Sequence, residues 1–143
     1  MDFKSTIGYM LHHLASSLDS ASDKILKDQF NVGLAQFRIL LVLEAQDGIT
    51  QKKIAGELSQ TEASISRQIK ILAQKGLIEI EGNFDNKRER RIYQTHEGHE
   101  VAAGSIKALN DYHQPIFASL SEEEQAQLSE ILKKLSEGLE KAN

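Results

Sequence analysis

Apolar residues near the N-terminus recur at alternating intervals of four and three residues, the spacing that places side chains on one face of a helix. The series is Ile7, Leu11, Leu14, Leu18, Ala21 and Ile25. It predicts a first helix over residues 4–28, with an apolar seam suited to packing along another helix. After a break at residues 31–33, the same spacing predicts a second helix that ends before the turn-forming pair Asp47 and Gly48.

Two short helices joined by a tight turn are predicted next. Thr50 can cap a helix that ends near Leu58. Thr61 can cap another helix that runs to Lys75, with Gly76 as its C-terminal stop. Two short helices in this order, followed by a hairpin, form a unit in which the second helix can enter the major groove of DNA.

The second of these helices has two contrasting faces. Ile65, Ile69 and Leu72 recur at intervals of four and three, so they are expected to face the core. The opposite surface then carries small, polar and basic side chains: Ala63, Ser64, Ser66, Arg67, Gln68, Lys70 and Gln74. The guanidinium of Arg67 can pair with guanine O6 and N7, while Lys70 is expected to contact phosphate as a point charge. The alternative is an ordinary solvated helix face.

A change to a period of two predicts a β-hairpin after residue 77. Ile78 and Ile80 alternate with glutamates, and residues 91–94 alternate again beyond a polar turn. The arm between them offers Asn83, Lys87, Arg88 and Arg90 for contact with the DNA backbone or the minor groove. Alternatively, the basic cluster only protects an edge strand, and Arg91 pairs with Glu79 or Glu81 across the hairpin.

Two further helices are expected in the C-terminal part of the chain. Thr95 can cap the first, which should end or kink near Pro115. Ser121 and Glu124 match a capping box at the start of the second. The second helix carries another apolar seam, made of Leu128, Leu132, Leu135 and Leu139. The chain is therefore expected to be mainly α-helical with a small β-hairpin wing.

Charge is distributed unevenly along the 143 residues. The formal net charge is −4, but residues 51–91 contain nine Lys and Arg against six Asp and Glu, a local charge of +3. The basic segment therefore coincides with the two short helices and the hairpin, as expected for a local nucleic-acid-binding surface. No run approaches the ~20 apolar residues of a membrane span, so a cytoplasmic protein with no membrane partner is expected.

Several chemistries are not expected from the residue content. The chain has no cysteine, which excludes disulfides and thiolate metal sites. Two histidine pairs could suggest a metal site: His96 and His99, which are three residues apart, and the adjacent His12 and His13. Adjacent side chains point ~100° apart on a helix, so His12 and His13 are poorly placed to bind one ion. No metal site and no cofactor are therefore expected. The absence of a glycine-rich phosphate loop, a nucleophile elbow and a zinc signature indicates that the protein is not an enzyme.

The combination of these motifs resembles the MarR family of multiple-antibiotic-resistance regulators over essentially the whole chain. The matching runs are residues 54–58 (IAGEL), 64–72 (SISRQIKIL), 75–78 (KGLI), the basic wing and 95–98 (THEG). The resemblance implies a winged helix-turn-helix with the order helix, helix, strand, helix, helix, strand, wing, strand, helix, helix. Two positions depart from the family pattern. Asn86 stands two positions before Arg88, where an acidic residue is common, although Asp85 lies beside it. Gln94 precedes Thr95, where a leucine is usual.

The resemblance also implies how the chain would work. Residues 1–30 and 100–143 would form a helical dimerisation region, and residues 33–98 the DNA-binding region. A homodimer would bind a pseudo-palindromic operator in double-stranded DNA and repress nearby genes until a small aromatic or anionic effector relieves repression. Candidate effector-binding residues are Tyr9, His12, His13, Phe37 and Arg38. The alternative function is a winged-helix module that binds protein without specific DNA binding.

Overall fold

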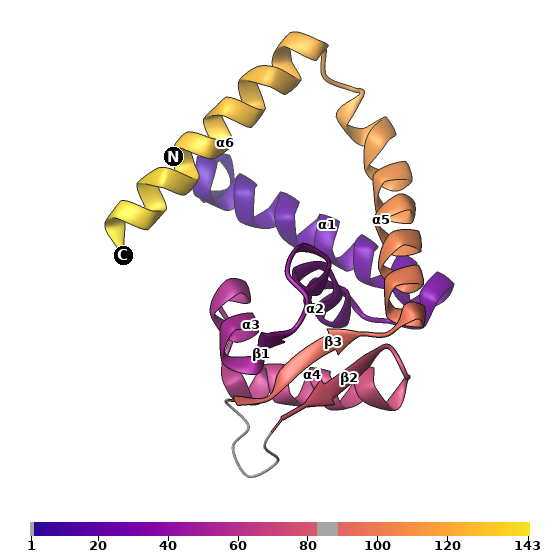
Figure 1. Ribbon diagram of the computed structural model, residues 1–143. Helices are drawn as coiled ribbons and strands as arrows, with labels where there is room; N and C mark the ends of the chain where they lie inside the picture. Colours follow the sequence, from indigo (N-terminus) through magenta and orange to yellow (C-terminus); the bar gives the residue numbers. More distant parts are fainter. Residues whose placement is uncertain (1, 83–88) are drawn as a thin grey trace. The chain divides into compact units, whose positions relative to one another are not determined.

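The structure is a computed structural model that describes residues 2–82 and 89–143 (Figure 1). The elements are η1 (Phe3–Ser5), α1 (Ile7–Phe30), α2 (Leu34–Ala45), β1 (Ile49–Thr50), α3 (Gln51–Leu58), α4 (Glu62–Gln74), β2 (Ile78–Glu81), β3 (Arg91–Gln94), α5 (His96–Phe117) and α6 (Glu122–Ala142). This order confirms the mainly helical winged helix-turn-helix expected from the sequence. The chain divides into two compact units, Met1–Ala108 and Leu109–Asn143, so that α5 begins in the first and ends in the second.

Side-chain caps fix where most helices begin. The hydroxyl of Thr61 accepts a hydrogen bond of 3.1 Å from the Ser64 amide, and the hydroxyl of Thr50 accepts one of 3.2 Å from Lys53. Thr95 caps α5 in the same way, and Ser121 with Glu124 forms the expected capping box of α6. The caps predicted from the sequence are therefore confirmed, because capping depends on residues within one turn.

The first helix differs from the range expected for it. α1 begins at Ile7 instead of residue 4, because the Thr6 hydroxyl caps it by accepting a hydrogen bond from the Tyr9 amide at 3.3 Å. It ends at Phe30, where Asn31 adopts a left-handed conformation with φ of 56°. At the other end of the chain, α5 continues through Pro115 and ends at Phe117.

A small antiparallel sheet with strand order β1-β3-β2 supports the helix pair (Figure 1). Ile92 on β3 pairs with Ile49 on one side and with Ile80 on the other. Beneath the sheet lies the core of the first unit, whose fully buried large side chains are Leu26, Ile39, Leu40, Leu43, Ile54, Ile65, Leu72 and Ile92. The core therefore draws on α1, α2, α3, α4 and β3, and holds the helix pair in a fixed orientation.

Gln94, one of the two departures from the family pattern, lies at the end of β3. The side chain is buried in the core, and its Nε2 donates a hydrogen bond of 2.7 Å to the carbonyl oxygen of Leu40. The backbone amide of Gln94 donates to the Asp47 carboxylate at 2.9 Å. The Nε2 bond gives the buried amide one partner, whereas its Oε1 is buried and has no hydrogen-bond partner among the described residues.

Two apolar seams remain exposed within the chain. On α1, Ile7, Leu11 and Leu14 are exposed, and the buried residues of the helix are Ser22 and Leu26. On α6, in the second unit, no residue is buried, and the exposed apolar side chains are Leu128, Ile131, Leu132, Leu135 and Leu139. The seam of α6 and the first half of the α1 seam are thus exposed, whereas Leu18, Ala21 and Ile25 of the α1 seam are half-buried.

Candidate nucleic-acid interface

The turn between α3 and α4 orients the second helix of the pair. Ser59 ends α3 in a left-handed conformation with φ of 52°, and its amide donates to the carbonyl oxygen of Gly56 at 3.2 Å. The side chain of Gln51, at the start of α3, donates to the backbone carbonyl of Glu62 at 3.2 Å. The first residue of α3 is therefore tied to the first residue of α4, which keeps the crossing of the two helices rigid.

The buried face of α4 determines which residues point outward. Ile65, Ile69 and Leu72 are at most 2% exposed, as expected from their spacing. On the opposite side, Ala63, Arg67 and Lys70 are exposed, while Ser64, Ser66 and Gln68 are half-buried. Within residues 2–82 and 89–143, neither Arg67 nor Lys70 has a hydrogen bond or ion pair, so both charged groups are available to a ligand outside the chain.

Two polar residues of this face are engaged inside the protein. The Ser64 hydroxyl donates to Oε1 of Gln60 at 3.3 Å. The Oε1 of Gln68 accepts a hydrogen bond of 3.3 Å from the Nε2 of Gln36 on α2. Ser64 and Gln68 therefore present a fixed orientation, unlike the unconstrained side chains of Arg67 and Lys70.

Gln36 belongs to a polar network that the sequence analysis missed. Its Oε1 accepts hydrogen bonds from the Gly33 amide at 3.2 Å and from Nζ of Lys75 at 3.1 Å. Lys75 also donates to the backbone carbonyl of Asn31 at the end of α1. The sequence signal was a glutamine three residues after Gly33, a capping-box spacing, whereas the links to Gln68 and Lys75 arise only in the folded chain.

The wing can be described only in part. Asn83, Lys87 and Arg88, which were expected to contact DNA, lie outside the described residues. Arg90 is half-buried just before β3. Gly82 has φ of 121°, and a Cβ there would lie 3.2 Å from the carbonyl oxygen of Glu89. The base of the wing is therefore a position where glycine relieves both backbone strain and crowding.

Arg91 takes a partner that the sequence analysis did not consider. It lies opposite Glu81 in the register of the hairpin, but its Nη1 donates a hydrogen bond of 2.9 Å to the carbonyl oxygen of Gly48. This bond joins β3 to the turn before β1. Arg91 therefore has a structural contact within the described residues.

The candidate effector-binding residues have different environments within the chain. Phe37 is 6% exposed and packs in the core, and Nη2 of Arg38 pairs with Asp19 at 3.0 Å. Tyr9 stacks on His13, with ring centroids 5.7 Å apart and an interplanar angle of 6°. His12 is exposed on α1. The acidic partner of Arg38 is thus a residue of its own chain.

The described part of the chain holds no candidate metal site and no candidate membrane span. No group of three or more His, Asp or Glu side chains is placed to hold a metal ion there. None of the helices described has the length and apolar character needed to cross a bilayer. His99 and His96 instead contact carboxylates, with Glu44 at 2.8 Å from the first and Glu100 at 3.0 Å from the second.

Comparison with known proteins places this geometry in context. The family model described as a winged helix DNA-binding domain matches residues 35–113. The S. aureus MepR–DNA complex is similar, with 26% identity, a TM-score of 0.78, and coverage of 96% of this chain and 99% of that chain. A MarR/EmrR family transcriptional regulator from Acinetobacter sp. ADP1 has 26% identity, a TM-score of 0.83, and coverage of 99% of both chains.

A curated relative with a regulatory name matches a shorter part of the chain. The HTH-type transcriptional regulator BilQ of Clostridium symbiosum is 25% identical over 112 residues, which cover 78% of this chain and 76% of the relative. The matched regions of all these proteins include the helix pair and the sheet described above.

Proposed function

Because the chain belongs to the winged helix DNA-binding domain family and is a transcriptional regulator of the MarR type, we propose that it is a ligand-responsive repressor that binds a pseudo-palindromic operator as a homodimer. The relatives are named as transcriptional regulators, and we propose a regulatory and not an enzymatic role here too. A transcriptional regulator acts on chromosomal DNA, so we propose that the protein is cytoplasmic.

One observation carries the proposal: α4 buries its apolar face and leaves the guanidinium of Arg67 and the ammonium of Lys70 exposed. Within the described residues, neither charge is used by the fold. An exposed basic helix face behind a tight turn is suited to the major groove, which is ~12 Å wide. Arg67 would read guanine through two hydrogen bonds, and Lys70 would contact phosphate.

The remaining contacts extend from the same face and from the wing. We propose that Ala63, Ser64, Ser66 and Gln68 approach the bases or the backbone beside Arg67. Small side chains near the start of α4 let the helix lie deep in the groove. The wing residues Asn83, Lys87, Arg88 and Arg90 would reach the flanking backbone or minor groove.

A dimer would cover the exposed apolar seams. Exposed apolar patches on a chain of this size mark interaction surfaces, and both α1 and α6 carry one. We propose that residues 1–30 and 100–143 form the dimerisation region and residues 33–98 the DNA-binding region. A two-fold axis would then place two copies of α4 in successive major grooves, ~34 Å apart on a symmetric site.

We propose that an effector relieves repression by favouring a dimer whose two α4 helices no longer match this spacing, which requires different affinities for two dimer states. A small aromatic or anionic effector would bind near Tyr9, His12, Phe37 and Arg38. The ion pair of Arg38 with Asp19 is exposed, so an incoming carboxylate could displace Asp19 from the guanidinium.

The second candidate function is a module that binds protein. Salt dependence distinguishes the two, because DNA binding releases counterions and weakens steeply with salt, whereas an apolar interface changes little. We would measure fluorescence anisotropy of labelled mixed-sequence duplex DNA at several salt concentrations. A log–log slope of about −4 or steeper supports DNA binding through several phosphates. Absence of binding at low salt by a folded protein would contradict it.

A further inference from the structure

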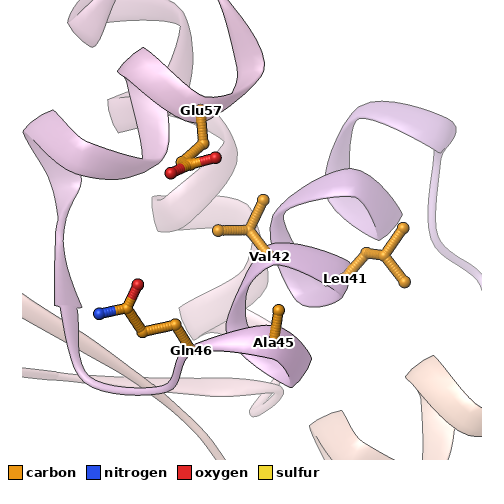
Figure 2. A pocket seen from close by; sticks show the side chains of 5 residues that line it. All are labelled: Leu41, Val42, Ala45, Gln46 and Glu57. Carbon is orange, nitrogen blue, oxygen red and sulfur yellow. The ribbon is translucent and has the colours of Figure 1, made fainter. Parts of the chain in front are cut away.

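A hollow opens in the first unit between the C-terminal end of α2 and α3 (Figure 2). Its volume is about 270 Å³, and it is lined by Leu41, Val42, Ala45, Gln46 and Glu57. Three of the five lining residues are apolar, and Leu41 is 42% exposed although it is a leucine. The hollow is therefore an accessible apolar surface with two polar groups at its side.

The polar groups come from different elements. Figure 2 shows Glu57 reaching from α3 toward Val42, and Gln46 extending from the end of α2 on the same side. Within the described residues, the Glu57 carboxylate has no hydrogen bond or ion pair, and the Gln46 side chain has none either. Both groups are available to a ligand.

The backbone adds negative potential at the same place. α2 ends at Ala45 and α3 ends at Leu58, so the C-terminal turns of both helices contribute residues to the hollow. Neither helix has a basic residue in its last turn, where Lys or Arg would offset the partial negative charge of a helix C-terminus. Glu57 places a full negative charge in the last turn of α3, which the helix dipole disfavours.

Nearby basic residues do not neutralise this site. Arg38 lies one turn before Val42 on α2, but its guanidinium is paired with Asp19. Lys53 lies one turn before Glu57 on α3 and is exposed, without an ion pair to Glu57. The nearby Glu44 is paired with His99. The hollow therefore combines an apolar wall with uncompensated negative charge.

We propose that this hollow binds a small amphipathic monocation, in which an apolar group contacts Leu41, Val42 and Ala45 while the positive centre lies beside Glu57. Burial of the apolar group removes surface from water, and the carboxylate and two helix ends favour a positive charge over a negative one. Gln46 offers a carbonyl oxygen to a ligand that carries N–H groups. The site differs in place and charge preference from the anion-binding residues considered above.

Occupancy would have a consequence for DNA, and this consequence rests on the proposed function. α3 supports α4 through the Gln51 to Glu62 hydrogen bond. A ligand wedged between α2 and α3 would favour a different separation of these helices and so a different position of α4. The site itself can be tested without DNA, so failure of ligand binding and failure of DNA binding are separate results.

The test uses benzyltrimethylammonium as the cationic probe and benzoate as the anionic one. Binding to the full chain is followed by two-dimensional NMR and isothermal titration calorimetry. A probe of this size is expected to bind with a dissociation constant on the order of 1 mM. Glu57→Gln should weaken benzyltrimethylammonium about threefold to fivefold, the range for one partly exposed charge pair. Ala45→Phe, which fills the hollow, should abolish binding.

Glu79→Gln is the matched control, because it makes the same charge change on β2 and Glu79 does not line the hollow. The proposal expects unchanged affinity in this variant and no shift of the Leu41 and Val42 signals with benzoate. Equal weakening in Glu79→Gln, equal binding of benzoate, or retained binding in folded Ala45→Phe would overturn it. Lack of binding by the folded wild-type chain at 20-fold above the expected dissociation constant, about 20 mM, would overturn it as well.

Discussion

The Nε2 of Gln36 donates a hydrogen bond of 3.3 Å to the Oε1 of Gln68, and thereby joins the first turn of α2 to the flank of the exposed α4 face. The same side chain accepts from Lys75, which follows α4. Gln36 thus contacts Gln68 near the middle of α4 and Lys75, the residue that directly follows the helix. Its amide is therefore a positioning group for α4, although Gln36 does not belong to the exposed face of that helix.

We expect Gln36→Leu to lower the free energy of unfolding by about 1–2 kcal/mol, because Gln68 and Lys75 both lose a partner. It should also weaken binding to a specific DNA site, since the orientation of α4 is less restricted. Urea denaturation and DNA titration measure the two effects. Gln127→Leu, on an exposed position of α6, is the control and should leave stability within ~0.5 kcal/mol.

Arg67 and Lys70 should differ in the kind of binding they support. Arg67→Ala is expected to cost about 1–3 kcal/mol at one base position and to relax the preference there, because a bidentate contact to guanine is lost. Lys70→Ala should weaken all sequences alike and reduce the salt slope by about 1. Titrations of the best site and of its single-base variants separate these effects. The same profile in both variants would contradict the assignment.

A substitution in the wing extends this comparison. Arg88→Ala should weaken all sequences equally and lower the salt slope, as expected for a phosphate contact. The measurement is again a salt titration on the specific and mixed-sequence duplexes. A selective loss on the specific duplex alone would instead assign Arg88 to base recognition.

Thr61 caps α4, and its removal should destabilise the chain without changing any side chain on the exposed α4 face. Thr61→Ala should reduce the free energy of unfolding by about 1 kcal/mol, because the Ser64 amide loses its acceptor. Thr61→Ser keeps a hydroxyl at the cap and should retain most of the stability. Chemical denaturation measures both variants, and equal losses would argue against the cap.

Gly98 lies where no side chain fits. A Cβ at this position would be 2.1 Å from the carbonyl oxygen of Leu77, which is backbone and cannot rotate away. Gly98→Ala should therefore destabilise the chain by about 2–3 kcal/mol. Gly56→Ala, within α3, meets nothing within 4 Å and should stabilise by about 0.5–1 kcal/mol. Thermal and urea denaturation of the two variants should give opposite signs.

Asp23 makes stability depend on pH at the junction of α1 and α2. The hydrogen bond from Lys27 and then that from the Leu34 amide, which is 2.8 Å long, hold the pKa of Asp23 below its ordinary value of 3.8. A lowered pKa stabilises the folded state above the unfolded value, and this contribution disappears as pH falls through the folded pKa. The stability difference between wild type and Asp23→Asn should thus be constant near neutral pH and shrink below pH 3.8.

The control for this prediction is Asp28→Asn, an exposed position on the same helix. Urea denaturation at a series of pH values gives both curves. A difference for Asp23→Asn that grows as pH falls would reverse the expected sign.

Local features of this fold could be predicted from the sequence because their causes are local. Thr50, Thr61 and Thr95 cap helices through bonds to residues three positions later, and the period of Ile65, Ile69 and Leu72 specifies their burial. The outward position of Arg67 followed from the same period. The capping and burial of these residues can be predicted without knowing which distant residues they contact.

Contacts between distant residues could not be predicted in this way. Gln94 reaches the carbonyl oxygen of Leu40 across 54 positions, and Arg91 reaches that of Gly48 across 43. Both partners are backbone carbonyls, which have no residue-specific sequence signal. Glu57 was equally inconspicuous, because a glutamate on a short helix is ordinary until the fold places it beside the end of α2.

The most direct test of the central claim is selection of genomic DNA fragments by the purified full chain and by Arg67→Ala, followed by sequencing. The account predicts that the wild-type chain enriches a two-fold symmetric site, with half-sites about one helical turn apart. It also predicts that Arg67→Ala loses preference at one position of each half-site. Absence of enrichment over random fragments, or an unchanged preference in Arg67→Ala, would contradict DNA recognition through α4.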